Sequence, residues 1–138
     1  MKVILGLGCD RNTSLTTLNT AVEQSLAMAG LDKSAVGGVA SIDKKNDETA
    51  ILQLAADHAW SLTFYPAEQL AQVPVPNPSE VVRKYMGTPA VAEAAALLAA
   101  GVGSELLLEK HKYRGEDGKN ATVSIASISK KRTRHEDR

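Results

Sequence analysis

Residues 2–7 have the sequence KVILGL, a compact apolar run that leads into the glycine-rich loop of residues 6–8. A short run of Val, Ile and Leu bounded by glycine predicts a buried β-strand. The polar residues 12–14 are good helix N-caps, and apolar residues then recur at helical spacing from Leu15 to Leu26. A strand that passes through a glycine loop into an amphipathic helix is typical of α/β domains.

The same alternation continues along the chain. We expect further strands at residues 39–42, 60–65, 106–113 and 121–128, and helices at residues 49–59, 67–71, 79–87 and 88–101. Residues 114–120, RGEDGKN, have the composition of a hairpin loop. Strand–helix alternation followed by a hairpin predicts a single α/β domain over residues 1–128, with a mixed sheet and helices on both faces. Residues 129–138 are basic and polar, and we expect a disordered tail there.

Composition narrows the function classes. The chain has 138 residues, no formal net charge and only 4% aromatic residues, so neither a basic field nor a base-stacking platform points to nucleic acid. The longest apolar stretch, residues 94–102, is too short to span a membrane. A single cysteine and the lack of a signal-peptide pattern favour the cytoplasm. We therefore expect a cytoplasmic protein without nucleic-acid or membrane partners.

The loop after the first predicted strand is the first candidate binding segment. Gly6 and Gly8 would let a ligand approach the backbone, and Arg11 could bind a carboxylate with both nitrogens. Arg11 and the following helix start are expected to lower the pKa of the Cys9 thiol, although a loop-lining role suits a lone cysteine better than a nucleophilic one. The dinucleotide and P-loop fingerprints are both incomplete. The alternative is a tight turn with a helix cap.

Charged residues after the second predicted strand form another candidate. Lys44, Lys45 and Glu48 follow residues 39–42, and parallel strands end at the same edge of a sheet. We expect them to meet Arg11 and the helical Glu93 in one cleft at that edge. The alternative is a solvated loop with Glu48 at a helix N-terminus, where the helix dipole favours a carboxylate.

Glu93 is the single charged residue in the apolar helix predicted at residues 88–101. A carboxylate on a helix that is apolar on all sides is costly unless it has a partner or a function. Either a structural ion pair, for example with Lys110, or a functional role would account for it. The three histidines lack metal-ligand spacing, so no metal site is expected.

Together these segments resemble the CobE/CbiG C-terminal domain family of cobalamin (vitamin B12) biosynthesis. The resemblance rests on the ordered patterns GLGCxR (residues 6–11), ASIDxKxxE (residues 40–48) and VAEAAAL (residues 91–97), with Lys110 and TVSIA (residues 122–126) fitting the last hairpin. Asp10 and Asn12 depart from it, since the family often has a second basic residue and a glycine there. The resemblance covers about residues 2–128.

This resemblance implies a three-layer α/β/α sandwich and a place in corrin synthesis. CbiG is a cobalt-precorrin-5A hydrolase, which opens a ring lactone and releases acetaldehyde, and CobE is a stand-alone counterpart in the aerobic pathway. Corrin precursors carry many carboxylates, which Arg11, Lys44, Lys45 and Lys110 could anchor. Glu93 or Glu48 could act as general base towards water. No cofactor is expected, because any cobalt arrives within the substrate.

Two functional hypotheses follow from the resemblance. In the first, the chain binds a corrin precursor, and any hydrolase activity needs the N-terminal region that full-length CbiG has and this sequence lacks. In the second, the chain is a non-catalytic partner or carrier module for that region or for another cobalamin-pathway enzyme. A third possibility, an anion or nucleotide binder, is disfavoured by the missing P-loop lysine.

Overall fold

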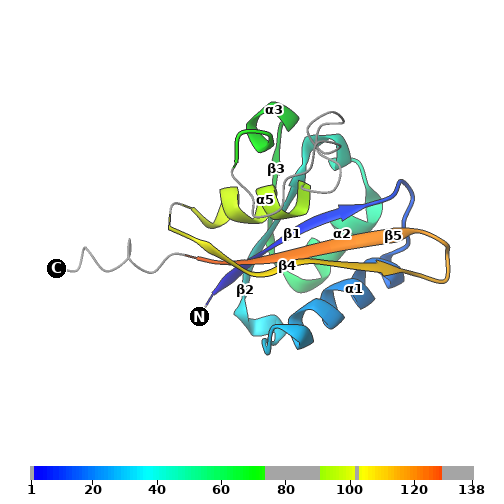
Figure 1. Cartoon of the computed structure of the whole chain (residues 1–138). Helices are drawn as coiled ribbons and strands as arrows, with labels where there is room; N and C mark the ends of the chain where they lie inside the picture. The colour runs from blue at the N-terminus through cyan, green and yellow to red at the C-terminus, as the bar shows by residue number, and fades with distance from the viewer. Residues whose placement is uncertain (1, 74–90, 102, 129–138) are drawn as a thin grey trace.

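The computed structural model describes residues 2–73, 91–101 and 103–128, and Figure 1 shows a five-stranded sheet between helices. The strand order is β3-β2-β1-β5-β4, with β1 parallel to β2 and β2 parallel to β3, whereas β5 is antiparallel to both β1 and β4. The predicted mixed sheet is therefore confirmed. The strands are β1 Val3–Cys9, β2 Val36–Ile42, β3 Ser61–Tyr65, β4 Glu105–Arg114 and β5 Asn120–Ser127.

Helices cover both faces of this sheet, which confirms the α/β class. One core contains α1 (Leu15–Met28) and α2 (Thr49–His58) with Val3, Leu5 and Leu7 of β1. The other contains α3 (Ala67–Leu70) and α5 (Val91–Ala100) with Ile4. Alternate residues of β1 thus enter opposite cores, as the period of a strand requires. None of the helices within the described ranges is long and apolar enough to cross a membrane.

Gly6 brings α5 close to the middle of the sheet. A Cβ at this position would lie 1.8 Å from the backbone oxygen of Ala92, so α5 rests directly on the backbone of β1. We predicted that Gly6 would let a ligand approach the backbone, but α5 occupies that space instead. Close approach of backbones is a common reason for glycine inside a strand.

Strand β2 is longer than the sequence predicted. It begins at Val36 rather than residue 39, and it includes Gly38, which pairs with Ser61 of β3. Glycine is depleted in strands, which is why the pair at residues 37–38 was expected to precede this strand. The predicted helix at residues 79–87, the first residues of the helix at 88–101 and the tail at 129–138 lie outside the described residues.

Candidate functional site

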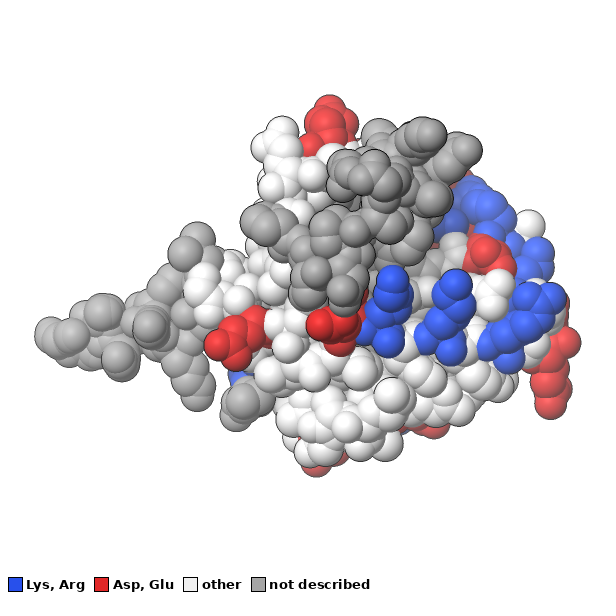
Figure 2. Space-filling model, in the orientation of Figure 1, with Lys and Arg blue, Asp and Glu red and all other residues white. Residues whose placement is uncertain are grey.

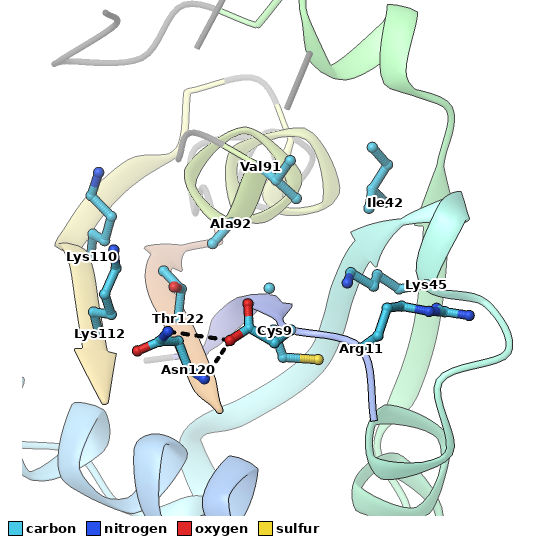
Figure 3. A pocket seen from close by; sticks show the side chains of 12 residues that line it. Cys9, Arg11, Ile42, Lys45, Val91, Ala92, Lys110, Lys112, Asn120 and Thr122 are labelled. Carbon is cyan, nitrogen blue, oxygen red and sulfur yellow. Dashed lines mark hydrogen bonds between the residues drawn. The ribbon is translucent and has the colours of Figure 1, made fainter. Parts of the chain in front are cut away.

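A cavity of about 750 Å³ opens where β1 and β2 end, between α5 and the β4–β5 hairpin (Figure 3). Its position at the carboxyl ends of parallel strands is the usual place for ligand binding in open α/β sheets. Among the described residues, the polar part of its wall consists of Cys9, Asp10, Arg11, Lys45, Lys110, Lys112, Asn120 and Thr122. The remainder, Gly8, Ile42, Val91 and Ala92, is apolar or glycine.

The loop after β1 is fixed by the hairpin on the far side of the cavity. Asn120 donates its backbone N–H and its side-chain amide to the same oxygen of Asp10, at 2.9 and 3.2 Å (Figure 3). The backbone N–H of Asp10 donates in return to the carbonyl of Asn120 at 3.0 Å. Asp10 thus joins two walls of the cavity.

The hairpin tip also caps α1. Asp117 Oδ2 accepts the backbone N–H of Ser14 at 2.9 Å, and Oδ1 accepts the Thr17 hydroxyl at 2.9 Å. These bonds, led by the Ser14 N–H, lower the pKa of Asp117 to about 2. A carboxylate at a helix N-terminus is favoured by the helix dipole as well. The hairpin therefore has a fixed position relative to α1.

Arg11 and Glu48 meet as predicted, but they bind each other. Arg11 Nη1 lies 2.9 Å from Glu48 Oε1, and Nη2 lies 3.0 Å from Asp47 Oδ1. The hydrogen bond and charge of Asp47 raise the pKa of Arg11, and Arg11 in turn lowers the pKa of Asp47. Glu48 is 4% exposed and occupies the N-cap position of α2. The structure thus places Glu48 in the helix-terminus role weighed for it.

Three lysines of the cavity wall differ from Arg11, because they form no ion pair with another described residue. Within residues 2–73, 91–101 and 103–128, neither Lys45 nor Lys110 nor Lys112 forms an ion pair within 4.0 Å. Lys45 lies beside Arg11 on one wall, whereas Lys110 and Lys112 stand on β4 opposite (Figure 3). Lys44 does not belong to the described lining, and its carbonyl accepts Arg11 Nη1 at 3.4 Å.

Sequence reasoning missed Lys112, although Lys110 two positions earlier was singled out. The pairing of β4 with β5 has one irregularity between Leu106 and Leu108 and a second between Leu108 and His111, and each shifts the register by one residue. Because the two shifts cancel, Lys112 lines the cavity together with Lys110, whereas His111 bonds a side chain of α1 at 2.7 Å. The alternation of a strand, counted from Lys110, is the signal that could have found Lys112.

Cys9 lines the cavity, but its thiol is not activated. Burial is the largest influence and raises the pKa of Cys9, while the charge of Lys45 and a hydrogen bond with Thr13 act against it. The expectation of a lowered pKa was wrong in direction. Arg11 does not offset the burial, since its charge is balanced by Asp47 and Glu48. This environment suits a cavity-lining thiol.

Glu93 does not belong to the described lining of the cavity, although its neighbours Val91 and Ala92 do. Its side chain is 1% exposed, and neither carboxylate oxygen has a hydrogen-bond partner among the described residues. Burial raises its pKa, with the positive charge of Lys110 opposing this effect and Glu109 adding to it. The predicted ion pair with Lys110 is absent from the described ion pairs. The expected cleft thus contains Arg11 and Lys45 but not Glu93.

The parts of the chain that the structure describes contain no group of three His, Cys, Asp or Glu residues able to hold a metal ion. The described lining of the cavity combines three ammonium groups and a guanidinium with one hydroxyl, a thiol and an apolar wall, while its one carboxylate is bonded to Asn120. Such a lining attracts anionic, partly apolar ligands.

Comparison with known proteins identifies the family of the chain. Residues 3–126 match the family described as "Cobalamin synthesis G C-terminus". The chain belongs to this family. The recognition of the CbiG C-terminal family from its sequence patterns is thereby confirmed, and cobalamin biosynthesis is the process that the family serves.

Two curated relatives differ in length. The chain is 32% identical over 124 residues to "Cobalt-precorrin-5A hydrolase" of Priestia megaterium, covering 90% of the chain but 32% of that protein. It is 39% identical over 110 residues to "Protein CobE" of Sinorhizobium sp, covering 78% of the chain and 71% of that protein. The chain thus spans about a third of the length of the hydrolase and about 71% of the length of CobE.

A crystal structure of CobE, described as a protein from the cobalamin (vitamin B12) biosynthetic pathway, has the same fold. The TM-score is 0.75 at 30% sequence identity, and the match covers 93% of this chain and 91% of that one. The fold of the chain is therefore the one that the sequence patterns implied.

Proposed function

We propose that the chain binds a polycarboxylated corrin precursor in the cavity between α5 and the β4–β5 hairpin. The observation that supports this most directly is the set of three lysines on the wall that form no ion pair with another described residue. Lys45, Lys110 and Lys112 present ammonium groups from two sides of one opening. Ammonium groups without carboxylate partners attract carboxylates of a ligand.

The apolar part of the wall suits the body of such a ligand. Ile42, Val91 and Ala92 are at most 6% exposed, and they line the same cavity as the lysines. A macrocycle with carboxylate arms has an apolar ring and a charged periphery. Binding sites for ligands of this kind combine apolar surface with a few polar groups that fix orientation.

Hydrolysis by this chain alone has weaker support than binding. A general base must reach a water molecule beside the reacting bond. Glu48 is held by Arg11 and by the backbone N–H of Asn12 at 2.7 Å, and Glu93 is not among the described lining residues. We therefore propose that any lactone-opening activity needs a further protein region, such as the remaining part of the hydrolase relative.

A second candidate function is a non-catalytic module for another cobalamin-pathway enzyme. The difference in length between the chain and the hydrolase from Priestia megaterium favours this function, because the chain spans 32% of that protein. In that case the same cavity would present or pass on the precursor. For both functions we propose a cytoplasmic location, consistent with one cysteine and no disulfide.

Binding can be tested by absorbance titration of a polycarboxylated tetrapyrrole, uroporphyrin, at low and high ionic strength. We expect weaker binding at high salt, because exposed charges are screened. Lys45→Gln should weaken binding about twofold to fivefold, the range for one exposed charge contact. Lys33→Gln is the matched control, since Lys33 pairs with Glu23 outside the cavity lining. No binding at either salt concentration would contradict the proposal and favour a partner module that positions another enzyme without holding the precursor itself.

Cys9 provides a second test that locates the ligand. Because it is the single cysteine of the chain and lines the cavity, alkylation by iodoacetamide reports on this wall alone. Its raised pKa makes slow alkylation at neutral pH and faster alkylation at higher pH the expected behaviour. Uroporphyrin should slow the reaction further, as followed by mass spectrometry. Binding without protection of Cys9 would place the ligand elsewhere.

A further inference from the structure

The basic side of the cavity is built on an edge strand. β4 is the last strand of the sheet order, and Lys110, Lys112 and Arg114 are exposed along it. Figure 2 shows basic side chains gathered in a row over the half of β4 nearest the hairpin loop. Lysine on an edge strand also discourages pairing with other chains. That role requires only exposure, whereas Lys110 and Lys112 additionally line a cavity.

Lys110 and Lys112 face the same way because they lie two positions apart on β4. The pairing of β4 with β5 has two irregularities, one on either side of Leu108, and each adds one residue to β4. The two shifts cancel, so the lysines line the cavity on the side where Leu106 packs beside α5, whereas Leu108 packs against the core of α1 and α2. Figure 3 shows the two side chains on the same side of β4, one after the other along the strand.

We infer that Lys110 and Lys112 form a paired carboxylate site that selects ligands with two neighbouring carboxylates on the edge of an apolar body. This inference rests on the proposed function, and it specifies how the ligand is chosen. Positions two apart on a strand are separated by about 6–7 Å. Flexible lysine side chains at that spacing can each meet one of two carboxylate arms that leave adjacent ring atoms.

The surroundings of the pair support a specific orientation. Thr122, the cross-strand partner of Lys112, lines the cavity and adds a hydroxyl to this wall. Val91 and Ala92 of α5 line the cavity together with the lysines and supply the apolar surface for the ring. Asp10, the carboxylate within the described lining, is occupied by Asn120. Lys112 is therefore the specificity-determining residue that we expect to matter most.

Two porphyrins test this selection directly. In uroporphyrin every pyrrole ring carries an acetate beside a propionate, whereas in coproporphyrin methyl groups replace the acetates. We expect the protein to bind uroporphyrin about twofold to fivefold more tightly than coproporphyrin, the effect of one additional exposed charge contact. Lys112→Gln should bring this ratio close to one, while Lys112→Arg, which keeps the charge, should retain most of it.

The control is Lys119→Gln, which removes the same charge from the same hairpin outside the described lining of the cavity. It should leave the ratio unchanged. Thermal unfolding verifies that each variant is folded, and Lys110→Gln is the second variant should Lys112→Gln fail to fold. Equal affinity of the wild type for both porphyrins, or an unchanged ratio in Lys112→Gln, overturns the paired site while binding itself stands. Failure to bind either porphyrin overturns the proposed function as well.

Discussion

The guanidinium of Arg11 lies 2.9 Å from the carboxylate of Glu48, and this contact fastens the loop after β1 to the N-terminus of α2. The second oxygen of Glu48 accepts the backbone N–H of Asn12 at 2.7 Å. Asn12 has a φ of 62°, in the left-handed region that glycine and asparagine adopt most readily. This conformation suits asparagine as well as the glycine that the resemblance led us to expect at this position. One buried carboxylate thus holds the whole turn that borders the cavity.

Replacing Glu48 should therefore loosen the loop. We expect Glu48→Ala to lower the free energy of unfolding by roughly 1–3 kcal/mol, because the Asn12 N–H loses its acceptor and Arg11 loses a charged partner. Urea unfolding followed by circular dichroism measures the change. Glu68→Ala is the control, since Glu68 is an exposed carboxylate in α3. Equal stability of the Glu48→Ala and Glu68→Ala variants would show that the turn does not depend on this carboxylate.

Replacing Glu93 should have the opposite effect and increase the free energy of unfolding. A buried ion pair would make its removal strongly destabilising, by about 3–5 kcal/mol. Its oxygens have no hydrogen-bond partner among the described residues, so we expect Glu93→Met to stabilise the fold by roughly 1–3 kcal/mol. Methionine has a similar length and no polar group to desolvate. Thermal and urea unfolding of both forms decide between these two outcomes.

The advantage of Glu93→Met should also depend on pH. Burial raises the pKa of Glu93, so the folded protein holds this proton more tightly than the unfolded chain. The contribution of the protonated group to stability is complete below the unfolded value of 4.5 and is lost as the pH rises through the folded value. We therefore expect the stability difference between variant and wild type to grow from acidic to neutral pH. A difference that stays constant with pH contradicts the assignment.

The contact between β1 and α5 can be tested with two glycines of the same strand. Gly6→Ala would place a Cβ 1.8 Å from the carbonyl oxygen of Ala92, which α5 can relieve only by moving. We expect a loss of roughly 1–3 kcal/mol or more, as for overpacked cores. In Gly8→Ala the nearest atom, the Cβ of Thr122, would be 3.9 Å away, so this variant should keep its stability. Similar melting temperatures for the two variants would mean that α5 does not rest on Gly6.

Acid titration should reveal the cap that Asp117 provides to α1. Its folded pKa of about 2 is below its unfolded value of 3.8, so the carboxylate stabilises the fold above the unfolded value. That stabilisation is lost as the pH falls from roughly 4 to 2. Asp117→Asn should therefore flatten the acid side of a plot of melting temperature against pH. Asp57→Asn, which removes an exposed carboxylate bonded to Gln53 within α2, serves as the comparison.

Local sequence patterns predicted the order and type of the elements well, because their causes are local. The apolar run of β1, the caps before α1 and the loop between β4 and β5 each depend on neighbouring residues. The extension of β2 through Gly38 was missed, because pairing with Ser61 outweighs the low strand preference of glycine. Tertiary contacts thus corrected boundaries and left the architecture unchanged.

The candidate site was less predictable, since it depends on partners far apart in the chain. Topology brought Arg11 and Glu48 together as expected, but their mutual ion pair requires knowledge of side-chain geometry. The pKa of Cys9 had the opposite direction to the prediction, because burial exceeds the effect of nearby cations. Each of these features depends on packing that sequence spacing does not encode.

The strand order has a consequence for folding during synthesis on the ribosome. β1 is synthesised first but lies between β2 and β5, and its loop residue Asp10 bonds Asn120 across 110 positions. Until β5 leaves the exit tunnel, one side of β1 has no neighbouring strand, and α1 lacks the cap from Asp117. Contacts this distant in sequence slow folding, and exposed strand edges invite aggregation. Folding of this domain is therefore completed only after the β4–β5 hairpin has been synthesised.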